Sequence, residues 1–150
     1  MSQPVPAEES IEDQLAQLEP SRWTALARGV LGHAISDAGA SHVQTLHGGT
    51  GGGTGGVYRV AGTATDHGQI VTWSVVLKVL RPPAGHRIVG MTAAPAGWAT
   101  DPGHYSYWPR EALAYRSGLL ESLPGNIGAP RCFGVEDRPD GAIWLWLEDL

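Results

Sequence analysis

The glycine-rich segment 48–56 constrains this chain more than any other feature of its sequence. It reads Gly-Gly-Thr-Gly-Gly-Gly-Thr-Gly-Gly, with seven glycines in nine positions. Because glycine has no Cβ, backbone amides in such a segment can approach an anion closely, and consecutive amides can form a phosphate-binding concavity. The same composition is also typical of flexible linkers. The segment therefore predicts either a phosphate-binding loop or a spacer.

The residues around this segment favour strands. Residues 42–46 are a short strand candidate, and 57–65 and 70–80 are rich in β-branched and aromatic residues. Asp66-His67-Gly68 supplies turn chemistry between the last two, which predicts a hairpin. The glycine segment is therefore expected to connect two strands.

Three nucleotide-binding designs use glycine-rich loops. The P-loop needs a Gly-Lys pair, and the chain has none. The dinucleotide pattern G-x-G-x-x-G is present as Gly51, Gly53 and Gly56, but a helix should follow it and a strand follows here. The remaining design is a glycine turn between antiparallel strands that covers phosphates, with a lysine on the next strand.

Lys78 is the only lysine, and it lies in the apolar run 73–80. Strand alternation puts Val76 and Lys78 on one face and Leu77 and Val79 on the other. A buried ammonium needs an anionic partner, which predicts a functional contact. The alternative is an edge-strand lysine whose amine reaches solvent.

The remaining elements are mostly helical. Helical spacing of apolar residues predicts one helix from Ser10 and a second from an N-cap at Ser21 to a stop at Gly32, with no chemistry assigned to either. Pro109 fits the first position of a helix that runs to about Leu123. Residues 131–136 and 142–147 predict a second hairpin.

Charge and composition narrow the classes of partner. Five of the 15 acidic residues precede residue 20, and the rest of the chain carries ten charges of each sign, which argues against nucleic-acid binding. Cys132 is the only cysteine, so an internal disulfide and a multi-cysteine metal site are excluded. No long apolar run or secretory signal is present, so we expect a soluble cytoplasmic protein without a membrane partner.

Taken in order, these motifs resemble the N-terminal lobe of the aminoglycoside phosphotransferase family, which are small-molecule kinases built on the protein-kinase fold. The resemblance spans roughly residues 20–150. It is carried by the glycine segment running into Val57-Tyr58-Arg59-Val60, by Val75-Val76-Leu77-Lys78, by Tyr107-Trp108-Pro109-Arg110-Glu111, by Ala129-Pro130-Arg131-Cys132-Phe133-Gly134, and by 144–150.

The resemblance implies an α+β fold: an antiparallel sheet of about five strands with one internal helix and N-terminal flanking helices. It divides the chain into an acidic tail and helix over 1–19 and a kinase-like lobe over 20–150 that ends at the hinge. The C-terminal catalytic lobe is expected to lie outside this chain. Such a lone lobe should expose an apolar face around Trp144 and Trp146.

The resemblance also implies a site for ATP or GTP. Lys78 would bind the α and β phosphates, Glu111 would hold the lysine in place, and Val76 would pack on one face of the base. The backbone from Glu148 to Leu150 would meet the edge of the base. The phosphates would lie under the amides of the glycine loop, namely Gly51, Gly52, Gly53, Thr54, Gly55 and Gly56.

Glu111 has a second explanation. As the third residue of the predicted helix, its carboxylate is favoured by the helix dipole by about 0.3–1 kcal/mol without any catalytic role. The apolar stripe of that helix also places Glu111 towards one edge and Arg116 nearer its centre. The sequence leaves both explanations of Glu111 open.

Phosphoryl transfer also needs a carboxylate for the acceptor hydroxyl and ligands for Mg²⁺. In the resembled family these lie in an H-x-D-x-x-x-x-N segment and a later Asp, and no histidine here has an Asp two residues on. The chain alone is therefore expected to be inactive and to bind ATP weakly. The implied activity is transfer of a γ-phosphate to a hydroxyl of an aminoglycoside, sugar or other small alcohol. The alternative is a non-catalytic nucleotide-binding or protein-interaction module.

Overall fold

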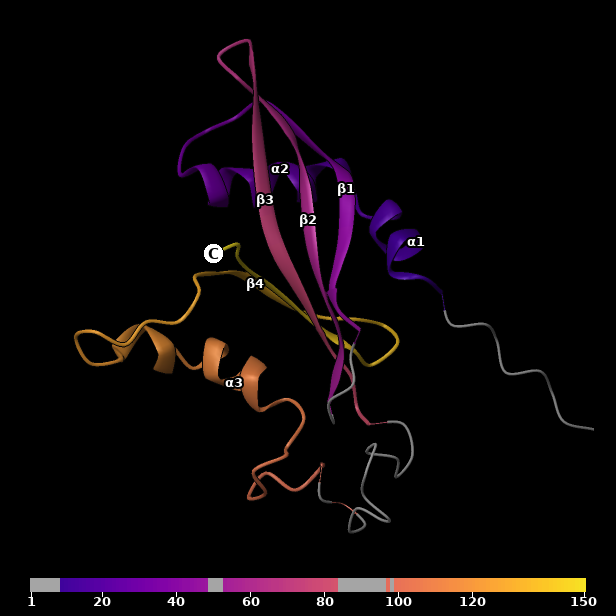
Figure 1. Ribbon diagram of the computed structural model, residues 1–150, viewed down its shortest axis with the longest axis vertical. Coiled ribbons are helices and arrows are strands. Elements are labelled where there is room, and N and C mark those ends of the chain that lie inside the picture. Colours follow the sequence, from indigo (N-terminus) through magenta and orange to yellow (C-terminus); the bar gives the residue numbers. More distant parts are fainter. Residues whose placement is uncertain (1–8, 49–52, 84–96, 98) are drawn as a thin grey trace, which may run out of the picture.

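A computed structural model describes residues 9–48, 53–83, 97 and 99–150. Within them the chain forms a five-stranded antiparallel sheet with helices packed against it, which confirms the predicted α+β class (Figure 1). The elements are α1 (Ile11–Ala16), α2 (Pro20–Leu31), β1 (Asp37–His47), β2 (Thr54–Asp66), β3 (Gln69–Leu80), α3 (Arg110–Arg116), the 3₁₀ helix η1 (Leu119–Ser122), β4 (Cys132–Asp137) and β5 (Ile143–Glu148).

The strands lie in the order β1-β2-β3-β5-β4, and every neighbouring pair is antiparallel. Both predicted hairpins are therefore confirmed. β3 lies between β2 and β5, so the interpretation of Lys78 as an edge-strand lysine is wrong. The first strand begins at Asp37 instead of residue 42, because β2 is long enough to supply backbone partners as far as Thr65.

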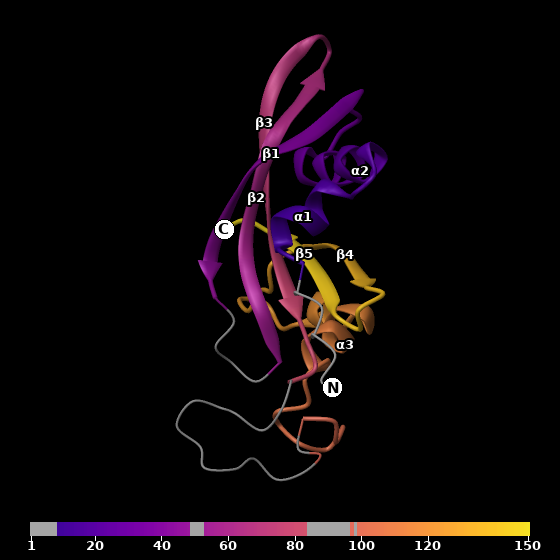
Figure 2. The same ribbon diagram turned by 90° about the vertical axis from the view of Figure 1, so that its right-hand side faces the viewer.

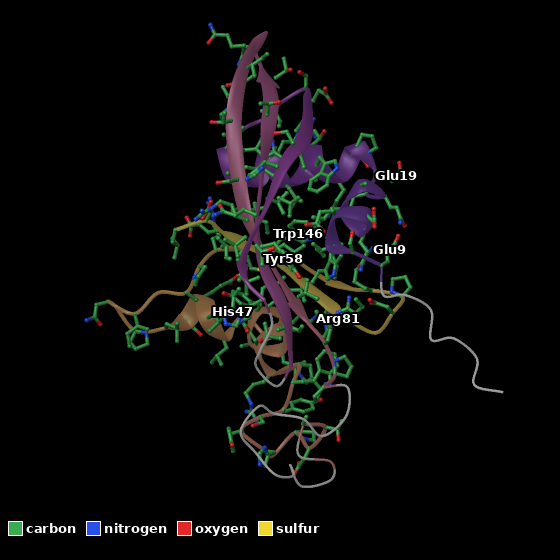
Figure 3. All side chains as sticks on the ribbon, turned by 45° about the vertical axis from the view of Figure 1, so that its right-hand side comes forward. Glu9, Glu19, His47, Tyr58, Arg81 and Trp146 are labelled. Carbon is green, nitrogen blue, oxygen red and sulfur yellow. The ribbon has the colours of Figure 1, made fainter. Side chains whose placement is uncertain are left out.

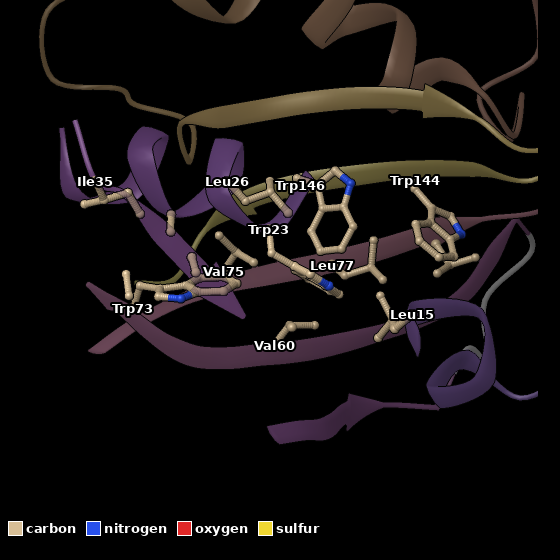
Figure 4. Packing of buried hydrophobic residues seen from close by; sticks show 14 of the residues in the cluster. Leu15, Trp23, Leu26, Ile35, Val60, Trp73, Val75, Leu77, Trp144 and Trp146 are labelled. Carbon is tan, nitrogen blue, oxygen red and sulfur yellow. The ribbon is translucent and has the colours of Figure 1, made fainter. Parts of the chain in front are cut away.

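The main core lies between α2 and one side of the sheet (Figure 2). Trp23, Leu26 and Ala27 of α2 are buried there against Val75 and Leu77 of β3. The ring centroid of Trp23 is 6.1 Å from that of Trp73 and 6.0 Å from that of Trp146, the latter pair edge to face (Figure 4). The N-terminal helices thus serve packing, as the sequence predicted.

The helix starts differ in how they are capped. The Ser10 hydroxyl accepts a hydrogen bond from the Asp13 amide at 3.1 Å, so the predicted start of α1 is confirmed. α2 begins at Pro20, one residue before the predicted cap, and Ser21 lies inside the helix. The reason is that proline's fixed φ suits the first helical turn, where its missing N–H is not needed.

The expected exposed apolar face around Trp144 and Trp146 is wrong, because both side chains are fully buried. Trp146 packs under α2 and donates through Nε1 to a Glu136 carboxylate oxygen at 2.9 Å, and the same oxygen forms an ion pair with Arg22. The Arg138 guanidinium carbon lies 4.1 Å from the centroid of the Trp144 ring. The N-terminal helix and these charged groups cover the tryptophans.

The internal helix is shorter than predicted. Pro109 is the N-cap, and α3 ends at Arg116 before Gly118 adopts a left-handed φ of 72° and η1 follows. The predicted apolar stripe does not form for the same reason, because the residues beyond 117 are not part of α3. Arg116 does not lie at a buried centre; it forms a 2.8 Å ion pair with Asp137, whose side chain is 74% exposed.

Candidate functional site

The side of the sheet opposite α2 carries Lys78 and Val76, and we call it the lysine face. The strand register places Lys78 between Val57 and Leu145. Val76 lies in the next row, between Arg59 and Leu147. The predicted alternation along β3 is confirmed, because Leu77 and Val79 belong to the α2-side core while Val76 is half-buried on the lysine face.

Lys78 and Glu111 meet across the lysine face. The Lys78 Nζ lies 2.5 Å from Glu111 Oε2, and the two side chains are 26% and 35% exposed. α3 is held in place by Ala112, which is fully buried in a small cluster with Leu80, Ile143, Leu145 and Leu147. The structure thus pairs the two residues that the sequence named as lysine and partner.

The two explanations of Glu111 coexist in this geometry. Glu111 is the second residue of α3 and lies in its first turn, where the helix dipole also favours a carboxylate. Its ion pair with Lys78 nevertheless joins a central strand to a helix 33 positions further along the chain. A dipole preference alone requires no such partner.

The described part of the glycine segment lies at the end of β3 and beside Trp108. Gly53 has a φ of 104°, its carbonyl accepts from the Arg81 amide at 2.9 Å, and a Cβ built on it would lie 3.0 Å from Cβ of Trp108. The turn therefore touches both the end of β3 and the approach to α3. Figure 3 shows His47 and Arg81, which flank this region, at the same end of the sheet.

The predicted loop residues divide into two groups. Thr54, Gly55 and Gly56 open β2, where Thr54 pairs with Leu80 and a bulge separates it from Gly56. The glycine segment thus continues into a strand, as predicted. Gly51 and Gly52 lie outside the described residues.

The predicted hinge follows β5 along the edge of the lysine face. Glu148 is opposite Val75, and its amide donates to the Arg131 carbonyl at 2.8 Å. That amide is therefore already used within the protein. Leu150 is exposed.

A cluster that was not predicted from the sequence includes Asp149 of the predicted hinge. Arg59 donates to both carboxylate oxygens of Asp149, at 2.8 Å from Nε and 2.9 Å from Nη2, and the Ser74 hydroxyl donates to the same group at 2.7 Å. Hydrogen bonding from Arg59 lowers the pKa of Asp149 against the opposing effect of burial. Arg59 and Asp149 are 90 positions apart, so only strand alternation at Arg59 offered a signal.

Two further ionisable groups, Tyr115 and Cys132, pack against the small cluster that contains Ala112 of α3. Burial, with the charge of Glu111 as the second cause, raises the pKa of Tyr115. Burial also raises the pKa of Cys132, whose thiol donates to the Gly134 carbonyl at 3.4 Å. A half-buried thiol with a raised pKa is a poor nucleophile, which argues against a reactive role for Cys132.

Among the residues that the structure describes, no group of three His, Cys, Asp or Glu side chains is close enough to hold a metal ion. In the same part of the chain, no helix has both the length and the apolar character needed to cross a membrane.

No protein-family model, curated protein or solved structure matches this chain. What the site can do is therefore argued from its own residues.

Proposed function

We propose that this chain is the nucleotide-binding lobe of a small-molecule kinase that transfers the γ-phosphate of ATP or GTP to an alcohol. The observation that carries the proposal is the Lys78–Glu111 ion pair, 2.5 Å long, between a central strand and the internal helix. A carboxylate partner orients the lysine ammonium. An ion pair with one carboxylate leaves donors for a second anion, because a lysine ammonium has three N–H groups.

The surroundings of Lys78 support a phosphate group as that second anion. Gly53 to Gly56 lie at the same end of the sheet, and the Gly53 turn contacts Trp108, three residues before Glu111. Amides in a turn without Cβ atoms can approach phosphate oxygens closely. Val76, one row along the lysine face, offers an apolar surface for a base.

The residues present therefore fit the base and phosphates of a nucleotide. Mg²⁺ would neutralise developing charge on the phosphates when bound, and we expect its ligands and the acceptor-activating carboxylate in a further lobe outside this chain. The acceptor would be a hydroxyl of an aminoglycoside, a sugar or another small alcohol. We further propose a cytoplasmic location, where nucleotides are abundant and a lone cysteine such as Cys132 stays reduced.

Titration with ATP and GTP, followed by NMR shifts of the 150-residue chain, tests this proposal. We expect a dissociation constant on the order of 1 mM or weaker, because half of the nucleotide site is expected elsewhere. Lys78→Met should abolish the shifts. Arg116→Met is the matched control, because it removes a cation from the exposed Arg116–Asp137 pair instead.

Two results would contradict the proposal. The wild-type chain showing no shifts with either nucleotide would remove the binding function, and unchanged binding by Lys78→Met would remove the lysine from it. Micromolar binding would show that the site is already complete within these residues.

A protein-interaction module is the second candidate, and it has an observation of its own. Leu113, Leu119 and Ile127 are 47%, 58% and 59% exposed, all within one segment that includes α3 and η1. Exposed apolar side chains of this kind favour contact with another protein surface. If Leu119→Ser and Ile127→Ser abolish association with a further lobe or chain while Lys78→Met does not affect nucleotide binding, this second candidate is favoured.

A further inference from the structure

Arg59 connects strands that are not neighbours. It lies on β2, while Asp149 follows β5, and β3 runs between these two strands. Its guanidinium therefore crosses β3 on the lysine face to reach Asp149. The register places it directly beside Val76, on the side of that residue opposite Leu147.

Three donor groups hold the carboxylate of Asp149 in this arrangement. It accepts two hydrogen bonds from Arg59 and one from Ser74, and its side chain is only 14% exposed. Paired hydrogen bonds between a guanidinium and a carboxylate fix orientation as well as distance. The backbone around residue 149 is thus attached to both β2 and β3.

We propose that Arg59, Ser74 and Asp149 are positioning residues that hold the 148–150 backbone at the base end of the nucleotide site. This inference rests on the proposed function, because the base is the ligand part that this backbone would meet. Arg59 and Leu147 border Val76 on its two sides, and the Ser74–Asp149 contact lies on the side of Val76 away from Lys78.

The geometry separates two ends of one ligand site. Along β3, Ser74, Val76 and Lys78 follow each other on the same face, so the cluster and the lysine lie on opposite sides of Val76. The cluster should therefore affect recognition of the nucleoside, and Lys78 should affect recognition of the phosphates. A residue that only stabilised the fold would affect both.

The test compares Asp149→Ala with wild type for two probes, adenosine and inorganic tripolyphosphate, by NMR titration of the 150-residue chain. We expect adenosine binding to weaken about tenfold, the size of one lost charged hydrogen bond, with tripolyphosphate binding unchanged. Hydrogen exchange at residues 148–150 should accelerate. Asp137→Ala is the matched control, since it breaks the 2.8 Å ion pair with Arg116 on the exposed side of α3.

Equal weakening of both probes would overturn the inference, because it would mean a general loss of structure. Unchanged exchange at residues 148–150 would also overturn it. If the wild-type chain binds neither probe, the proposed function fails, and hydrogen exchange alone decides whether the cluster holds this backbone. If Asp149→Ala does not fold, Ser74→Ala removes only the 2.7 Å hydrogen bond and should give the same effects at smaller size.

Discussion

The two sides of β3 differ in what fills them. Towards α2, Val75, Leu77 and Val79 are at most 1% exposed and pack with tryptophans. On the lysine face, Val76 and Lys78 are half-buried and stand among ion pairs to α3 and to the end of β5. Alternate residues of β3 thus belong to the apolar core, whereas Lys78 on the other side forms an ion pair.

A central strand of this sheet carries a half-buried lysine beside a complete apolar core. The larger apolar core lies on the α2 side, and a smaller buried cluster with Ala112, Leu145 and Leu147 packs on the lysine face. The charged groups of the lysine face are held at partial exposure, where an ion pair contributes little to stability. The lysine face therefore combines a small cluster that holds α3 with charged groups that can serve binding.

The largest difference between the two sides should appear on shortening neighbouring residues of β3. Leu77→Ala should lower the free energy of unfolding by about 2–5 kcal/mol, because it leaves a cavity in the α2-side core. Val76→Ala should cost about 1 kcal/mol, since that side chain is only half-buried. Urea denaturation measures both, and equal losses would show that the two faces are packed alike.

Gly62 tests the close approach of the β1 and β2 backbones. A Cβ there would lie 2.8 Å from the Gly39 carbonyl carbon and 2.9 Å from Ala40 Cα, and both atoms are backbone. Gly62→Ala should therefore destabilise the protein by about 1–3 kcal/mol. Gly39→Ala is the control, because a Cβ at that position meets nothing within 4 Å. Thermal unfolding of the two variants should separate them clearly.

The ion pair on the lysine face should matter less for stability than for binding. Lys78→Met and Glu111→Gln should each change the free energy of unfolding by under about 1 kcal/mol, because both side chains are a quarter or more exposed. Lys78→Met should still lose nucleotide binding. A stability loss of several kcal/mol in urea would instead place the pair among the structural contacts.

The smallest expected effect is a pH dependence from Asp149. Its pKa is lowered in the folded state by hydrogen bonding from Arg59, against an ordinary value of 3.8. Its contribution to stability is therefore complete above that value and is lost as the pH falls through the lower folded pKa. Asp149→Asn should flatten the acid limb of a stability curve measured below pH about 4.

Asp66 provides the comparison for that measurement. Its pKa is also lowered, first by a hydrogen bond from His33 and then by one from His67, at the turn between β2 and β3. Asp66→Asn should remove a separate part of the acid dependence. If Asp149→Asn leaves the acid limb unchanged and Asp66→Asn removes all of it, the Arg59–Asp149 pair contributes no measurable stability.

The local sequence signals predicted the strands well and the helix ends poorly. Turn residues and β-branched runs identified both hairpins, because these preferences act over a few residues. The predicted internal helix ran to about Leu123, whereas Gly118 turns left-handed after Arg116. Leucines at 119, 120 and 123 continued the helical period in the sequence. An apolar period of this kind gives no sign that the helix ends before Gly118.

Part of the candidate site could also be predicted from the sequence. The alternation of β3 placed Lys78 and Val76 on one face, and Lys78 does pair with Glu111. The Arg59–Asp149 pair was not predicted, because nothing local to either residue indicates a partner 90 positions away. Trp144 and Trp146 were expected at a surface, since the helix that covers them lies at the other end of the chain.

The sequence by itself determined the periodicity of the strands, the turn between β2 and β3, and the presence of one lysine in an apolar strand, because each depends on residues that are adjacent in the chain. Only the tertiary structure decided that β3 is central, that α2 buries the tryptophans, and that Arg59 reaches Asp149. These depend on which strands become neighbours in the sheet, and that order is set by packing of the whole chain.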